Sequence, residues 1–171
     1  MSGDVRDSSR SMPPFGLPER EMLEGWLEFH RKTLWFKCEG LDDAARKLRP
    51  VPSSLLSLHG LLRHMSEVER GWFQRGIART KAPRLYCEDD ENADFFPLDA
   101  ACWEQDVRTW EEQCTKSREV SSACSLDEIR ARRDGRDLTL RWVDCHTIEE
   151  YARHNGHADL IREMVDGSTG C

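Results

Sequence analysis

The chain has 171 residues, of which 38% are hydrophobic and 33% are charged, and its formal net charge is −7. This length suits one domain with a real hydrophobic core, and the acidic balance argues against nucleic acid as a partner. No apolar run approaches the ~18–20 residues that span a bilayer. The N-terminus also lacks the apolar region of a secretion signal, so we expect a cytoplasmic protein without a membrane partner.

The seven cysteines are an odd number, and no two of them form a CxxC pair. This pattern disfavours both a disulfide framework and a zinc ribbon. We therefore expect reduced, mostly structural thiols.

The N-terminal residues 1–16, rich in serine, proline and charge, are expected to be a flexible segment before a single domain over residues 17–171. A first helix is expected over residues 18–38, where apolar side chains recur at spacings of three and four residues. Gly40 follows as a stop signal.

A second helix is expected over residues 53–78, after the break at Pro52. Residues 79–97 then predict a long acidic loop. Loops of this length in a small domain are often lids, interface elements or disordered segments, and the sequence leaves the role of this one open. We expect Phe95 and Phe96 at its end to pack back on the body of the protein.

A third helix is expected over residues 98–121, followed by a short helical turn after Ser125 and a polar turn around Gly135. The last helix should span residues 139–166 and end at Gly167, a residue typical of helix C-termini. Long helical patterns without convincing strand runs predict an all-α, up-down four-helix bundle.

Three side chains of the second and last helices have the chemistry and spacing of metal ligands. Glu150 and His154 are four residues apart, on one face of one helix, and His64 lies among apolar residues that should face the interior. A polar column facing a core is costly unless it is paired or binds a cation. Three such ligands leave a coordination position open and suit Zn(II), with Ni(II) or Fe(II) as alternatives.

Two more histidines lie near this column. His146 is four residues before Glu150 and is either an outer neighbour of the metal or a surface residue. His157 lies about one turn beyond the column and is either a fourth ligand, a hydrogen-bonding neighbour of a ligand or a helix-capping neighbour of Asp159. On the residues alone, solvated or hydrogen-bonded polar side chains remain the alternative to a metal site.

Two stretches of the chain resemble the DinB-like superfamily: LHGLLRHMSEVERGWF (58–73) and RWVDCHTIEEYARHNGHADLIREMVDG (141–167). Within that superfamily they are most similar to an uncharacterised actinobacterial branch. The resemblance implies a DinB/YfiT-like four-helix bundle with a central metal bound by His64 and two residues of the last helix. Many members have two histidines there. This chain has Glu150 and His154, and it is similar in this to the mycothiol-dependent maleylpyruvate isomerases.

The resemblance also implies an enzyme that uses a low-molecular-weight thiol such as mycothiol, as an S-transferase or an isomerase. In that chemistry a metal-bound thiolate attacks an electrophile, so the partners are a small-molecule thiol and an electrophile, and a homodimer fits the family. Arg153 is a candidate to bind an anionic part of the cofactor or substrate, with Arg162 and Arg63 comparable.

Two alternatives remain open at this point. One is a non-catalytic, stress-associated bundle protein that binds a metal or a ligand, with His157 completing a closed coordination sphere. The other is a helical interaction protein that uses the acidic residues 88–94.

Overall fold

Helices make up most of the computed structural model, which describes residues 4–7, 9–87, 89–90, 92–131 and 135–170. One small two-stranded sheet accompanies them, so the fold agrees with the predicted all-α class. No helix in these ranges is long and apolar enough to cross a membrane. In chain order the elements are α1 (Glu19–Cys38), α2 (Asp43–Lys47), α3 (Leu58–Glu69), the π-helix η1 (Arg70–Ile77), α4 (Trp103–Ser122), β1 (Ile129–Ala131), β2 (Asp137–Thr139) and α5 (Leu140–Asp166).

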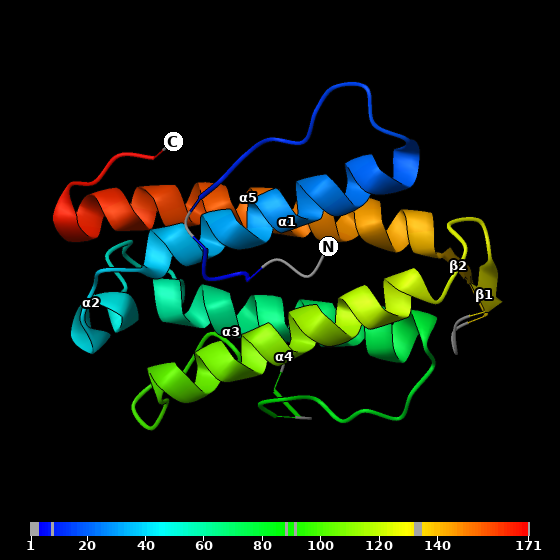
Figure 1. Cartoon of the computed structure of the whole chain (residues 1–171). Helices are drawn as coiled ribbons and strands as arrows, with labels where there is room; N and C mark the ends of the chain where they lie inside the picture. The colour runs from blue at the N-terminus through cyan, green and yellow to red at the C-terminus, as the bar shows by residue number, and fades with distance from the viewer. Residues whose placement is uncertain (1–3, 8, 88, 91, 132–134, 171) are drawn as a thin grey trace.

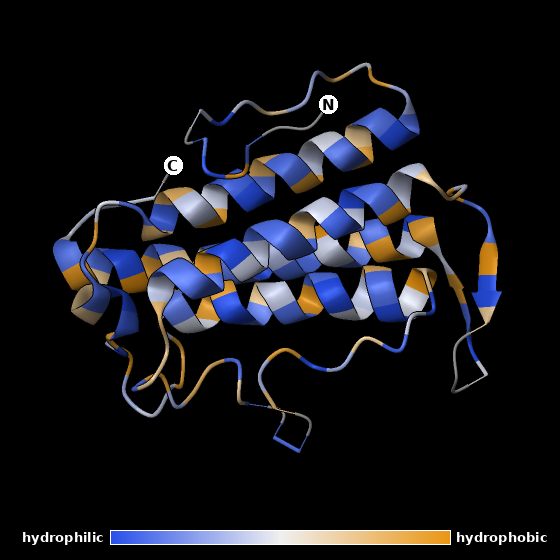
Figure 2. Ribbon diagram, turned by 60° about the horizontal axis from the view of Figure 1, so that its bottom comes forward, coloured by the Kyte–Doolittle hydropathy of each residue, from blue (hydrophilic) through white to orange (hydrophobic). Residues whose placement is uncertain are grey.

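The long helices lie side by side in two contacting pairs. Helix α1 runs along α5, while α3 and its continuation η1 run along α4 (Figure 1). Helix α3 also contacts α5, so the two pairs share one core. Figure 2 shows hydrophilic and hydrophobic residues interspersed along each long helix, as expected for helices with one buried face.

The first and last helices follow their sequence signals closely. Helix α1 spans the predicted segment to within one residue. The side chain of Thr139 accepts a hydrogen bond from the backbone N–H of Trp142 at 3.3 Å and so caps the start of α5. Gly167, with a φ of 79°, ends α5 in the left-handed conformation that glycine adopts without strain.

The second and third helices start later than predicted. Ser57 rather than Ser53 caps α3, because the Ser57 hydroxyl accepts from the Gly60 N–H at 3.1 Å, whereas Ser53 has a φ of 65° that no helix permits. The second half of the predicted helix is the π-helix η1. Helix α4 begins at Trp103, five residues after the predicted start.

A β-hairpin precedes α5, where the sequence predicted no strands and that prediction was wrong. β1 and β2 pair antiparallel, with Ile129 opposite Thr139. Strands of three residues are too short to show a recognisable alternation. The short helix α2, capped by the side chain of Asp42, was also not predicted, and the expected helical turn after Ser125 is a non-helical turn.

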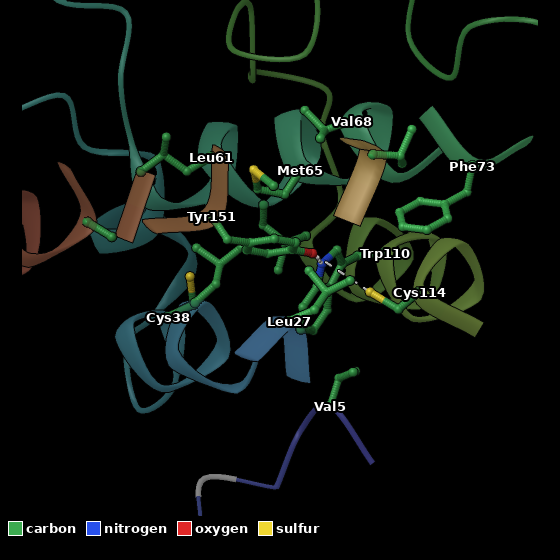
Figure 3. Packing of buried hydrophobic residues seen from close by; sticks show 14 of the residues in the cluster. Val5, Leu27, Cys38, Leu61, Met65, Val68, Phe73, Trp110, Cys114 and Tyr151 are labelled. Atoms are coloured by element: carbon green, nitrogen blue, oxygen red, sulfur yellow. Dashed lines mark hydrogen bonds between the residues drawn. The ribbon is translucent and has the colours of Figure 1, made fainter. Parts of the chain in front are cut away.

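Within the apolar core, the polar atoms of Trp110 and Tyr151 point toward one another (Figure 3), and other buried polar side chains join them. The indole N–H of Trp110 donates to the hydroxyl of Tyr151 at 2.9 Å, which in turn donates to a carboxylate oxygen of Glu69 at 3.0 Å. Arg31 donates to both oxygens of Glu69 at 2.8 Å. These fully buried side chains join α1, α3, α4 and α5, and they fix how α3 and α5 face one another.

Candidate metal centre

The structure brings the three predicted ligands together. His64 projects from α3, and Glu150 and His154 project from α5. One donor atom from each lies within 4.8 Å of the others. Glu150 Oε2 and His154 Nε2 are 3.4 Å apart, and the rings of His64 and His154 have centroids 4.6 Å apart. The four-residue spacing on α5 therefore directs both of its side chains toward α3, as the sequence predicted.

The donor set fits a divalent cation. Two ligands that each lie about 2.1 Å from a tetrahedral ion are about 3.4 Å from one another, which is the separation of Glu150 and His154. Burial, with the nearby His64, His157 and Arg153, lowers the pKa of His154 to about 3. The imidazole is therefore neutral, as a metal ligand must be.

The loop over residues 79–97 contributes two residues to this site that the sequence did not assign. Asp94 is buried, and its Oδ2 lies 2.7 Å from Nδ1 of His64. Phe95 stacks on the same imidazole with ring centroids 4.5 Å apart, whereas Phe96, which was also expected to pack inward, is 40% exposed. The loop therefore holds His64 through Asp94 and Phe95, and the Phe95 ring also lies 6.4 Å from the ring of His154 on α5.

His157 lies behind His154 rather than beside the other two ligands. Its Nδ1 is 3.3 Å from Nδ1 of His154, while Nε2 of His154 faces Glu150. If His154 coordinates through Nε2, its Nδ1–H is the donor and His157 the acceptor. The two candidate histidine ligands share one pattern: each has a partner at Nδ1, which leaves its Nε2 free for an ion.

His146 contacts the outer side of Glu150. Its Nε2 is 3.4 Å from Glu150 Oε1 and its Nδ1 is 3.3 Å from Glu149 Oε2. These three residues form a second group with ligand atoms close together. Arg153 forms an ion pair with Glu149, so a positive charge is already present at this second group. His146 is therefore placed as an outer neighbour of the centre.

The candidate arginines differ in their surroundings. Arg162 donates to the backbone oxygens of Lys37 and Glu39 at the end of α1. Arg63 donates to backbone oxygens of the loop at residues 93 and 94. Arg153 is 55% exposed at its side chain and lies 3.9 Å from Glu150, so it is the one of the three that stands beside the centre.

A cavity of about 330 Å³ lies on the α4 side of α3, away from the three clustered side chains. Its walls come from Arg63, the loop and the start of α4. The clustered side chains do not line it, so we place the chemistry at the cluster on grounds of donor geometry. The lining residues are Arg63, Leu85, Tyr86, Ala100, Ala101, Cys102, Gln105, Asp106 and Thr109.

The two buried thiols of the protein are poor candidates for the reacting group. The six cysteines among the described residues are all free, as the odd count and absence of CxxC predicted. Burial raises the pKa of Cys38 to about 12, and burial together with Glu69 raises that of Cys114 further. Neither buried thiol would ionise near neutral pH.

Residues 22–167 match the family model described as MST: Mycothiol-S-transferase. The matched span covers most of the chain and includes all three clustered side chains. No curated protein and no solved structure matches the chain.

Proposed function

The chain belongs to the mycothiol S-transferase family, a branch of the DinB-like superfamily, and we propose that it transfers mycothiol to a small electrophile with the help of a divalent metal ion, most simply Zn(II). The observation that carries the proposal is the meeting of His64, Glu150 and His154 from two different helices. Three nitrogen and oxygen ligands with an open position are typical of catalytic rather than structural zinc sites.

In this proposal residues 17–171 form one up-down four-helix bundle built from α1, α3 with η1, α4 and α5. Metal sites in such bundles are made by side chains of facing helices. His64 on α3 and the pair on α5 meet this requirement because α3 and α5 are in contact.

The residues present would hold the ion and tune it. His64 and His154 would bind through Nε2, since Asp94 and His157 occupy their Nδ1 atoms, and Glu150 would bind through a carboxylate oxygen. When bound, a divalent ion supplies the positive charge that keeps a thiol ligand ionised at neutral pH. Phe95, stacked on His64, would cover one side of the centre.

The transfer balances without a further reactant. The thiol proton passes to water, and the thiolate sulfur forms a bond to an electrophilic carbon. Either a leaving group departs with its electron pair, or the π electrons of a conjugated double bond move to its carbonyl oxygen, which then takes a proton from water. Arg153, exposed beside Glu150, would attract an anionic group of either substrate.

The test begins with metal content by plasma mass spectrometry on the full chain, for the wild type, His64→Ala and Glu150→Ala, with the exposed Glu163→Ala on α5 as a control. We expect about one equivalent in the wild type and the control, and loss in the other two. Metal-loaded protein should then conjugate mycothiol to members of an electrophile panel. A bound metal without any conjugation would instead support a non-catalytic metal-binding protein, and no metal after soaking with zinc and nickel would overturn the proposal.

A further inference from the structure

Three aromatic rings gather next to the candidate metal centre. Trp142 and His146 project from α5, and Trp72 projects from η1. Trp142 stacks on His146 with centroids 4.8 Å apart and an interplanar angle of 26°. Trp72 lies 5.0 Å from Trp142 and 4.8 Å from His146. We call these three residues the aromatic shelf.

The aromatic shelf adjoins the centre through His146, whose Nε2 is 3.4 Å from Glu150 Oε1. Trp142, His146, Glu150 and His154 follow one another at four-residue spacing on α5, so they form one column. Eight residues of α-helix rise ~12 Å, which is the length along the axis from Glu150 to Trp142. A single aromatic ring is shorter than this distance, so a ring stacked over Trp142 and His146 would meet a sulfur held at the metal ligands with its inner edge.

Trp142 leaves nearly half of its surface exposed. It is 48% exposed, whereas Trp110 is 0% exposed in the bundle interior. An exposed indole beside a reactive centre is a typical element of small-molecule sites, which are lined by aromatic side chains with a few polar groups. The π-helical turns of η1 supply the second indole, and π-helical segments occur frequently at functional sites.

We propose that the aromatic shelf binds the electrophile, and that the substrate class is therefore planar, conjugated electrophiles whose ring stacks on Trp142. This inference rests on the proposed transferase function and adds the substrate class to it. In the case of chlorodinitrobenzene, the sulfur–carbon bond forms at the ring carbon that bears chlorine, and chloride leaves with the electron pair of the broken bond.

The test compares chlorodinitrobenzene with iodoacetamide, a small electrophile that has no ring, for the metal-loaded full chain with mycothiol. The variants are Trp142→Ala, Trp142→Phe and a matched control, Leu160→Ala. Leu160 is 61% exposed on the same helix but ~27 Å along its axis from Trp142. Because aromatic stacking stabilises a bound ring, Trp142→Ala should raise KM for chlorodinitrobenzene about fivefold to tenfold. Its kinetics with iodoacetamide should not change, and Trp142→Phe should restore most of the loss.

A binding measurement separates this inference from the function on which it rests. Dinitrobenzene, which lacks the leaving group, is titrated calorimetrically into wild type, Trp142→Ala and Leu160→Ala. Binding that is lost only in Trp142→Ala supports the aromatic shelf even if no conjugation is found, in which case the transferase proposal alone fails. Three results would overturn the aromatic shelf and leave the transferase proposal standing. They are conjugation by the wild type with an unchanged KM in Trp142→Ala, equal effects of Trp142→Ala on both electrophiles, and equal binding of dinitrobenzene by all three proteins.

Discussion

Nδ1 of His64 lies 2.7 Å from Oδ2 of Asp94, so a residue of α3 is oriented by a residue of the loop thirty positions later. If the carboxylate accepts the Nδ1–H, Nε2 of His64 is the nitrogen left free to bind an ion. Hydrogen bonds of this kind select the tautomer and raise the basicity of a histidine ligand. The loop over residues 79–97 is therefore part of the candidate metal centre.

Asp94→Asn should weaken metal binding about tenfold to a hundredfold while the protein stays folded, because the amide keeps the shape but loses the charge of the carboxylate. A competition titration with a chromophoric chelator measures the affinity, and circular dichroism checks the fold. Asp99→Asn, an exposed substitution after the same loop, is the control. An unchanged affinity in Asp94→Asn would show that Asp94 does not tune the ligand.

The ligand spacing could be predicted because it is local. Glu150 and His154 are one helical turn apart, and the signals that bound α5, Thr139 and Gly167, are local too. His64 could be assigned to a buried face by its apolar neighbours. His64 meets Glu150 and His154 because α3 contacts α5. The helical pattern implies this contact once a helical bundle is assumed.

Asp94 could not be predicted in the same way. It lies among several acidic loop residues, and only the path of the loop distinguishes the one that reaches His64. The sequence also could not predict the π-helical form of η1, because the apolar stripe of the predicted helix continues through Trp72 and Phe73 without a break. The position of Trp72 beside Trp142 follows from that unpredicted geometry.

His157→Ala should keep about one equivalent of metal, whereas His154→Ala should lose it. The reason is that His157 contacts Nδ1 of His154 and stands outside the cluster of donor atoms. Metal content of both variants, with an affinity titration of His157→Ala, measures this, and a loss of affinity of up to about tenfold is compatible with an orienting role. Complete metal loss in His157→Ala would favour a closed, four-ligand site.

Glu69→Gln should destabilise the protein by about 3 kcal/mol, because it leaves the buried guanidinium of Arg31 with the partly exposed Glu28 as its remaining charged partner. Urea unfolding of the metal-free protein gives the free energy of unfolding. Glu67→Gln is the neighbouring control. Glu67 pairs with the partly exposed Arg75, so a loss of at most about 1 kcal/mol is expected.

A double-mutant cycle decides whether that effect belongs to the ion pair. Arg31→Met combined with Glu69→Gln should lose less stability than the sum of the two single variants, by at least about 1 kcal/mol, since the double variant no longer buries an uncompensated charge. Additive losses would assign the destabilisation to packing around each residue instead.

Asp144 predicts a pH dependence of stability that is independent of the metal centre. Its side chain is buried on α5, and its Oδ2 makes no hydrogen bond within the part of the chain that the structure describes. Burial raises its pKa from 3.8 to about 7, with Arg31 opposing the shift. The folded state therefore binds this proton more tightly than the unfolded state. The resulting stability is fully present below about pH 4 and is lost as the pH rises toward 7.

Asp144→Asn removes this titration, since the amide is neutral throughout. Relative to wild type, the variant should gain roughly 1–3 kcal/mol of unfolding free energy between pH 5 and pH 8, because only the wild type must bury a charge at the higher pH. Urea unfolding of both proteins in the presence of a chelator, at the two pH values, measures the difference. Histidines titrate alike in the two proteins and cancel, and Asp99→Asn should show no such gain. If the stability difference between Asp144→Asn and wild type is the same at both pH values, then Asp144 is ionised in the folded protein at pH 5 and its burial is compensated by a charge.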